Sequence, residues 1–171
     1  MESPADEQLT ADMNPSPVIV LTAVAALASA AVGGIFYAFS TFVMRGLNRT
    51  GPTDAFTAMR GINAEANANP AFLLFFVGSA LLALAVGVVA LIQIGRPGSW
   101  LLLAGAIFGI LGFVITMVFN VPLNNRLDRA DIADAAAEWQ SYFTAWTAWN
   151  HVRTGTGFIG AVLMLAGLAY R

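Results

Sequence analysis

The sequence predicts an all-α fold: a membrane-embedded four-helix bundle, with a short interfacial helix between the first two membrane helices and an extended helix leading into the fourth. Two observations indicate this fold. Of the 171 residues, 58% are hydrophobic and only 11% are charged, whereas a soluble domain carries about 25% charged residues. Four uncharged apolar runs also divide the chain, and a helix of about 20 apolar residues crosses the roughly 30 Å of hydrocarbon in a bilayer. The lipid bilayer is therefore the expected partner of most of the surface.

The apolar runs are predicted to be four membrane helices that form one domain over residues 18–171. They are residues 18–44, 71–94, 99–119 and 154–170. The fourth run has only 17 residues, and it reaches a sufficient length only if its helix begins upstream, near Trp146.

Residues 1–17 are predicted to be a polar, acidic N-terminal tail. We do not expect the first apolar run to be a signal peptide, because Glu2, Asp6 and Glu7 precede it and no basic residue does. The segment "ALASA" at 26–30 resembles a cleavage site, but the run continues well beyond it.

The connections contain recognisable turn and cap signals. After the turn "LNRTGP" at 47–52, Thr53 or Asp54 is predicted to cap a short helix that ends near Asn67, with Phe56, Met59 and Asn63 on one face. "GRPGSW" at 95–100 is predicted to be a tight hairpin in which Ser99 caps the third membrane helix.

Two pairs of small residues predict close helix packing. Ala30 and Gly34 are four residues apart in the first helix, and "GAIFG" at 105–109 is a GxxxG pattern in the third. These pairs and the apolar surface are compatible with a homo-oligomer but do not require one.

The distribution of arginines predicts an orientation in the membrane. In a four-pass protein both long connections, residues 45–70 and 120–150, lie on one side, with the hairpin and both termini on the other. Six of the eight arginines lie at the long-connection end. The positive-inside rule then places the long connections in the cytoplasm and the termini outside. The expected location is a cytoplasmic membrane.

Composition excludes several classes of function. The net charge of −2 provides no basic surface for nucleic acid. Cysteine is absent, so the chain has no thiol chemistry and no cysteine metal site. One histidine makes a poor metal site, although an axial haem ligand remains an open alternative.

Polar side chains from several segments are expected to meet at one end of the bundle. Arg153 precedes Arg171 by 18 residues, about 27 Å along a helix, so the two arginines lie near opposite boundaries. Asn120 reaches the level of Arg153, as does Tyr37 on the first helix. On the fourth helix, a rotation of 100° per residue places five residues within about 40° of a common direction, as a stripe along one face. Trp149 lies at the edge of this stripe. The stripe consists of Tyr142, Trp146, Asn150, Arg153 and Gly157.

Two interpretations of this cluster remain open. One is a structural network, in which asparagines cap helix ends and Arg153 extends to the interface. The other is a ligand pocket, in which Arg153 holds an anion or enolate oxygen, asparagines orient carbonyl or hydroxyl groups, and tryptophans stack on a flat ring.

His151 has a separate set of interpretations. It points about 100° from the Asn150 direction, toward a neighbouring helix or the lipid headgroups. Proton transfer is the functional interpretation. Glu65 is interpreted as a solvated loop residue rather than an acid catalyst.

Four segments resemble a known family: "GGIFYAFSTFVM", "AMRGINAEANANPAF", "NVPLNNRL" and "WTAWNHVR". The resemblance is to the bacterial branch, a domain of unknown function, of the integral membrane proteins grouped with the fungal anthrone oxygenases. It covers about residues 18–170, and the last two segments are its specific part. The positions that match the motifs are Met59, Asn63, Asn69, Pro70, Asn120, Pro122, Leu123, Asn124, Trp146, Trp149, Asn150 and Arg153.

The resemblance implies a four-helix membrane protein and, in the fungal branch, oxidation of an anthrone to an anthraquinone by O2. No cofactor motif is evident in the sequence, so a cofactor-independent reaction is expected, with O2 as co-substrate. Arg153 and Asn150 would stabilise a substrate anion, while His151 or a water accepts the proton. The expected substrate-binding residues are Asn63, Asn120, Asn124, Trp146, Trp149 and Tyr37.

A non-enzymatic membrane protein is the alternative. It would bind a small hydrophobic ligand or assemble with partner subunits. Transport ranks lower, because transporters carry polar groups near the membrane midplane and these helices are nearly free of them there.

Overall fold

The structure is a computed structural model that describes residues 16–171. All but the last two residues of the predicted tail lie outside that range. Within it, every element is helical, and four helices are long and apolar enough to cross a membrane. The predicted all-α class and four-helix bundle are confirmed.

Two of the four long helices are continuous but contain one wide, π-helical turn each. The first consists of α2 (Pro17–Ala38), the π turn η1 (Phe39–Val43) and α3 (Met44–Arg49). The third consists of α6 (Ser99–Ile115), the π turn η2 (Thr116–Asn120) and α7 (Val121–Arg129). Both therefore continue beyond the predicted apolar runs.

The other two long helices are uninterrupted. The second, α5 (Pro70–Ile92), begins at the proline predicted for its first turn. The fourth, α8 (Ala135–Ala169), follows a short 3₁₀ turn, η3 (Ile132–Asp134), and has 35 residues. The predicted upstream extension of the fourth helix is thus confirmed, and it begins 11 residues before Trp146.

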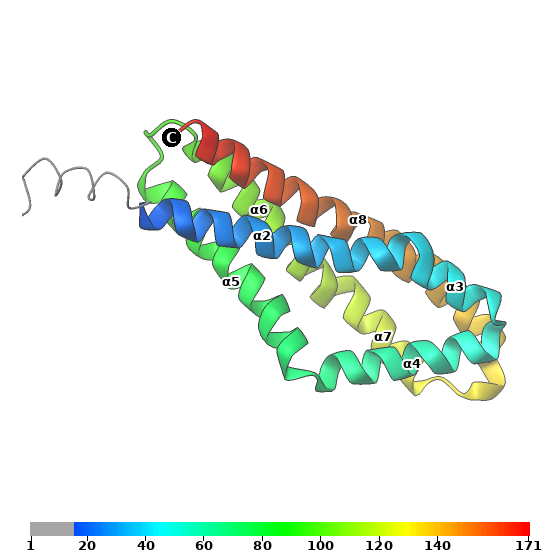
Figure 1. Ribbon diagram of the computed structural model, residues 1–171. Coiled ribbons are helices and arrows are strands. Elements are labelled where there is room, and N and C mark those ends of the chain that lie inside the picture. Colours follow the sequence, from blue (N-terminus) through cyan, green and yellow to red (C-terminus); the bar gives the residue numbers. More distant parts are fainter. Residues whose placement is uncertain (1–15) are drawn as a thin grey trace, which may run out of the picture.

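The membrane bundle consists of α2, α5, α6 and α8, with α8 packed along both α2 and α6 (Figure 1). Glycines allow the closest approaches. A Cβ atom on Gly157 of α8 would lie 2.8 Å from Gly33 Cα of α2. One on Gly105 of α6 would lie 2.9 Å from Gly160 O of α8. The GxxxG pattern is therefore used inside the bundle.

The small-residue contact predicted on α2 needs a correction. A Cβ atom on Gly34 would meet nothing within 4 Å, whereas Gly33 approaches the backbone of Gly157. One residue in a helix corresponds to a rotation of about 100°, so Gly34 lies at the predicted level but faces away from α8. Ala30, the other residue of the predicted pair, packs against the buried core of the bundle.

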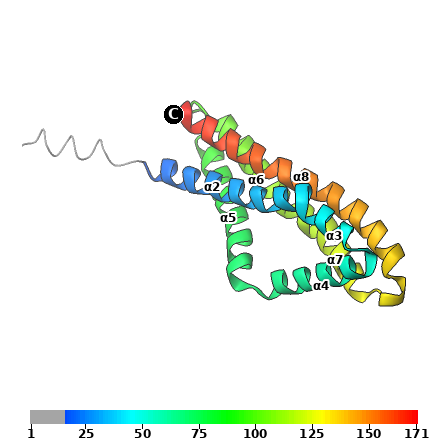
Figure 2. The same ribbon diagram turned by 45° about the vertical axis from the view of Figure 1, so that its right-hand side comes forward.

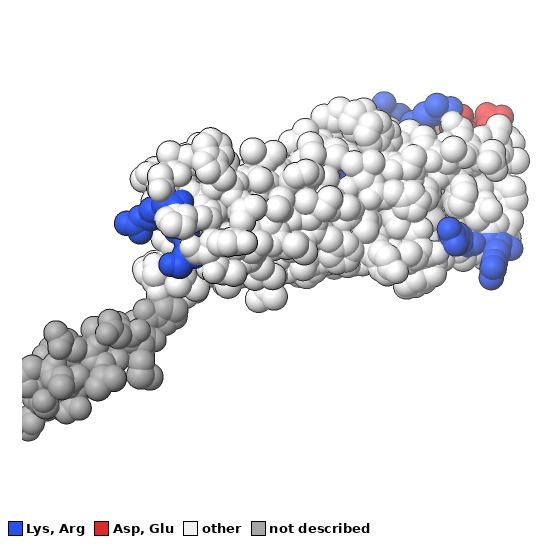
Figure 3. All heavy atoms as spheres, turned by 90° about the horizontal axis from the view of Figure 1, so that it is seen from above, with Lys and Arg blue, Asp and Glu red and all other residues white. Residues whose placement is uncertain are grey.

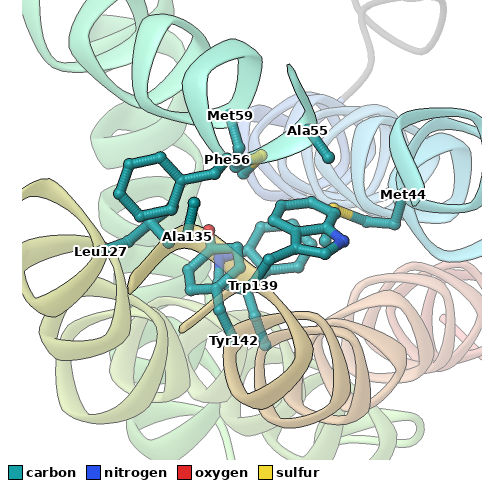
Figure 4. Close-up of a cluster of buried hydrophobic side chains, with 9 residues drawn as sticks. Met44, Ala55, Phe56, Met59, Leu127, Ala135, Trp139 and Tyr142 are labelled. Carbon is teal, nitrogen blue, oxygen red and sulfur yellow. The ribbon is translucent and has the colours of Figure 1, made fainter. Parts of the chain in front are cut away.

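A second core lies beyond the membrane bundle, where α3, α7 and the first half of α8 project together. The helix α4 (Pro52–Ala68) packs against all three. Figure 4 shows Met44 of α3, Phe56 of α4 and Trp139 of α8 converging in this outer core. The short helix between the first two membrane helices is therefore part of the packed structure.

The start of α4 differs from the prediction. The cap position is Gly51, with φ of 95°, and Pro52 begins the helix without a side-chain cap from Thr53 or Asp54. Glycine tolerates this φ value, and proline favours the first helical position. The face predicted for α4 is observed, since Phe56 and Met59 are buried and Asn63 is half-buried.

The hairpin between α5 and α6 also differs in detail. Gly98, with φ of 75°, occupies the cap position of α6, and the Ser99 hydroxyl donates to Gln93 O at 2.6 Å. Ser99 therefore closes the hairpin instead of capping the helix.

Charged and apolar side chains occupy different parts of the surface. Figure 3 shows arginines at the two ends of the molecule, acidic side chains at one end, and an almost uncharged band between. The exposed surface of α2, α5, α6 and α8 includes many large apolar side chains, such as Leu74, Leu81 and Val162. The chain is an integral membrane protein.

Candidate functional site

Arg153 is the most buried charged side chain among residues 16–171, with 4% of its surface exposed. Its Nη1 lies 3.3 Å from Thr116 Oγ1, and its Nη2 donates to Asn150 Oδ1 at 2.7 Å. The guanidinium also lies over two aromatic rings, 4.1 Å from the Phe36 centroid and 4.9 Å from that of Trp146. These contacts offset part of the cost of removing the cation from water.

Asn150 connects Arg153 to the first helix. Its Nδ2 donates to Phe36 O and to Ser40 Oγ, both at 2.7 Å, and no part of the residue is exposed. Because its nitrogen meets two acceptors, its oxygen must face the guanidinium. The Ser40 hydroxyl also lies 3.2 Å from Thr154 Oγ1.

The two π turns lie beside this network. Ser40 belongs to η1, whereas Thr116 and Asn120 belong to η2. Such turns are frequent at functional sites. The turn η2 ends two residues before Pro122, whose nitrogen has no hydrogen to donate.

The predicted asparagines of the third helix bond to α8. Asn120 is fully buried, and its Nδ2 donates to Trp146 O at 3.3 Å. Asn124 Oδ1 accepts a hydrogen bond from Tyr142 OH at 2.8 Å. The helix continues through Pro122, so both asparagines face α8, as their spacing predicted.

A cavity of about 630 Å³ lies between α2, α4, the start of α5, α7 and α8. In Figures 1 and 2, α5 diverges from α2, and α4 runs back from α5 to the far end of α3. Most of the lining is apolar or aromatic, from residues such as Phe36, Phe39, Met59, Ile62 and Phe72. This size and character suit a small, flat organic ligand.

The polar part of the lining is rich in unused hydrogen-bond donors. The buried atoms Arg153 Nε, Trp146 Nε1 and Asn63 Nδ2 have no hydrogen-bond partner in the described structure, and all three residues line the cavity. Buried polar groups are normally paired, so an unpaired group needs an explanation. Three donors around one cavity match a ligand with an acceptor oxygen.

The structure divides the predicted site residues into three groups. Arg153, Trp146, Asn63 and Asn124 line the cavity. Asn150 and Asn120 lie behind this wall and hold Arg153 and the backbone of Trp146. Tyr37, Trp149 and His151 do not line the cavity.

The placement of these last three residues is a correction. Tyr37 is 53% exposed and packs edge-on against Phe158, while Trp149 stacks on Phe119 at 3.6 Å. His151 is exposed on the outer side of α8. It follows Asn150 directly, and the rotation of about 100° per residue turns it away. We therefore do not retain His151 as the proton acceptor.

Several residues of the site were not given a role from the sequence. Phe36, Ser40 and Thr116 surround the guanidinium or its partners. Glu65 was interpreted as a solvated loop residue, but it lies on α4, where it is exposed and lines the cavity. Ser40 and Thr116 could have been found from the sequence, because a hydroxyl side chain inside an apolar run is expected to have a polar partner.

In the described part of the chain, no group of three His, Cys, Asp or Glu side chains lies close enough together to hold a metal ion.

The fold and site define a class: an integral membrane four-helix protein with a buried arginine and a ligand-sized cavity at one end of its bundle. A family model described as anthrone oxygenase matches residues 71–163, more than half of the chain. The chain belongs to the anthrone oxygenase family. The match includes Asn120, Trp146, Asn150 and Arg153, whereas the walls from α2 and α4 lie outside it. No curated protein and no solved structure matches the chain.

Proposed function

We propose that the cavity binds a flat aromatic compound of the anthrone type and that the protein oxidises it with O2 without a bound cofactor. One observation carries the proposal: three buried, unpartnered donors, on Arg153, Trp146 and Asn63, belong to the wall of a mostly apolar cavity. A tricyclic ketone offers a flat apolar body and one acceptor oxygen to such a site.

The chemistry uses the charge of Arg153. Loss of a proton from the CH2 group of an anthrone moves negative charge onto its carbonyl oxygen. Donors and a cation that are already oriented stabilise such an anion more than the neutral ketone, and a single donor of this kind contributes about 10²–10³ in rate. Asn150 acts indirectly, because it fixes the orientation of the guanidinium through their 2.7 Å hydrogen bond.

The oxidation balances without a further redox partner. The carbanion form of the substrate reacts with O2 to form a carbon–oxygen bond, and protonation gives a hydroperoxide. Loss of the remaining C–H proton and departure of hydroxide then form the second carbonyl. One anthrone and one O2 therefore give one anthraquinone and one water.

The test is oxygen uptake by the purified protein in detergent with anthrone as substrate. Uptake well above spontaneous oxidation, lost in the Asn150→Ala/Arg153→Ala double variant, supports the proposal. Arg45→Ala is the matched control, because Arg45 is an exposed arginine on α3 outside the cavity. Arg153→Met preserves much of the side-chain volume and separates loss of charge from loss of folding.

A non-enzymatic binding protein would give a different result. Anthrone would bind to the folded protein without stimulated oxygen uptake. That outcome would overturn the oxygenase proposal and leave the cavity as a ligand-binding site.

We also propose that the cavity end of the molecule faces the cytoplasm. The arginine distribution supports this orientation, with Arg45, Arg49, Arg60, Arg126 and Arg129 outside the membrane bundle at that end.

A further inference from the structure

We infer that Glu65 is the proton acceptor of the reaction, an inference that rests on the proposed function. The expected acceptor, His151, lies outside the cavity, so the site requires another base or a water. Among the described residues that line the cavity, Glu65 is the only one with a carboxylate.

Glu65 and Arg153 occupy different depths of the cavity. Arg153 is 4% exposed and belongs to α8, at the buried end. Glu65 belongs to the last turn of α4, is exposed, and lies on the open side of the cavity together with Gly61. A flat substrate between the two presents its oxygen to the guanidinium and its opposite edge to the carboxylate. In an anthrone, the CH2 group lies across the central ring from the carbonyl.

Asn69 lies beside the Glu65 carboxylate. Asn69 caps α5, and its Oδ1 accepts a hydrogen bond from Phe72 N at 2.9 Å. The amide orientation is therefore fixed, and Nδ2 faces Glu65 Oε1 in a long contact of 3.5 Å. The other carboxylate oxygen has no hydrogen-bond partner among the described residues and is available to the substrate.

The proton transfer has a balanced course. The Glu65 carboxylate takes one CH2 proton, and the electron pair of that C–H bond moves into the ring system as the oxygen becomes anionic beside Arg153. After O2 adds to this carbon, the carboxylic acid returns its proton to the peroxide oxygen. The carboxylate then removes the remaining C–H proton as the O–O bond breaks and the second carbonyl forms. The departing hydroxide takes up that proton to give water.

The experiment compares Glu65→Gln with Asp54→Asn. Both residues are exposed acids on α4, but Asp54 does not line the cavity. Base catalysis contributes about 10²–10⁴-fold, so we expect kcat to fall by at least 100-fold in Glu65→Gln and to be unchanged in Asp54→Asn. Anthrone binding, followed by tryptophan fluorescence, should be retained in both variants.

Chemical rescue separates a base from a structural residue. We expect added acetate to restore part of the turnover of Glu65→Ala but not that of Arg153→Met. Wild-type turnover should also slow when the CH2 group carries deuterium. If the wild type oxidises anthrone and Glu65→Gln is equally fast, Glu65 is not the base and the proposed function stands. If the folded wild type gives no stimulated oxygen uptake, the proposed function is wrong, and the role of Glu65 that rests on it is wrong as well.

Discussion

Arg153 and Asn150 are three residues apart on α8 and share a 2.7 Å hydrogen bond, with the Asn150 oxygen toward the guanidinium and its nitrogen toward Phe36 O. The amide is therefore bonded at both ends, and it links a buried cation to the backbone of another helix. Replacement of this one side chain changes both the stability of the bundle and the site.

We expect Asn150→Ala to lower the free energy of unfolding by about 1–3 kcal/mol, because it removes the amide hydrogen bonds to Phe36 O and Ser40 Oγ and leaves one buried guanidinium nitrogen without a partner. Asn150→Asp should bind the substrate anion more weakly, since a carboxylate beside Arg153 neutralises its charge. Thermal unfolding in detergent measures the first effect and oxygen uptake the second. Asn125→Ala, on the exposed side of α7, is the control and should change neither.

A second prediction concerns the contact between α2 and α8. Gly157→Ala would place a Cβ atom 2.8 Å from Gly33 Cα and 3.0 Å from Ser29 O. Both are backbone atoms that cannot move aside, so we expect a loss of about 1–3 kcal/mol in stability. At Gly155, a Cβ atom meets nothing within 4 Å. Gly155→Ala should therefore be neutral or slightly stabilising, and equal Tm values for the two variants would contradict the packing described.

The indole of Trp146 should report binding. It lines the cavity, whereas Trp149, Trp139 and Trp100 do not. We expect an anthrone-type ligand to quench tryptophan fluorescence, and Trp146→Phe to remove most of that change while Trp100→Phe retains it. Trp146→Phe also removes an unpartnered donor, so the ligand should bind roughly 5–10-fold more weakly, corresponding to about 1 kcal/mol for one hydrogen bond. Unaltered quenching in Trp146→Phe would place the ligand elsewhere.

The absence of cysteine allows a direct test of orientation. Arg129→Cys and Arg96→Cys introduce single exposed thiols at opposite ends of the molecule. In intact cells, a membrane-impermeant maleimide should label the Arg96→Cys variant and not the Arg129→Cys variant. The reverse labelling would place the cavity end outside the cytoplasm.

The stripe on α8 could be predicted because helical geometry alone determines it. All five of its residues are buried, and their spacing at 100° per residue places them on one face: Tyr142, Trp146, Asn150, Arg153 and Gly157. The level of Asn120 followed from counting residues along the third helix. Depth and periodicity are properties of one helix, so they need no knowledge of its neighbours.

Rotation of one helix against another could not be predicted in the same way. Tyr37 lies at the same depth in the membrane as the site, but its side chain is exposed. Phe36, one residue earlier, faces Arg153 instead. Likewise His151 faces outward beside the buried Asn150. The position of Glu65 depends on how α4 packs on α7 and α8, and that packing is a tertiary property that local sequence does not specify.

The open side of the cavity combines two environments. Ile35, an exposed apolar residue within the membrane-spanning part of α2, lines it together with Glu65 of α4. A tricyclic aromatic compound dissolves mainly in lipid, because transfer of apolar surface out of water is favourable. The rate of turnover then depends on the surface concentration of substrate in the membrane and not on its concentration in solution. Additional empty vesicles should slow turnover at a fixed total amount of substrate, as expected for surface dilution, and the oxidised product would return to the same two-dimensional phase.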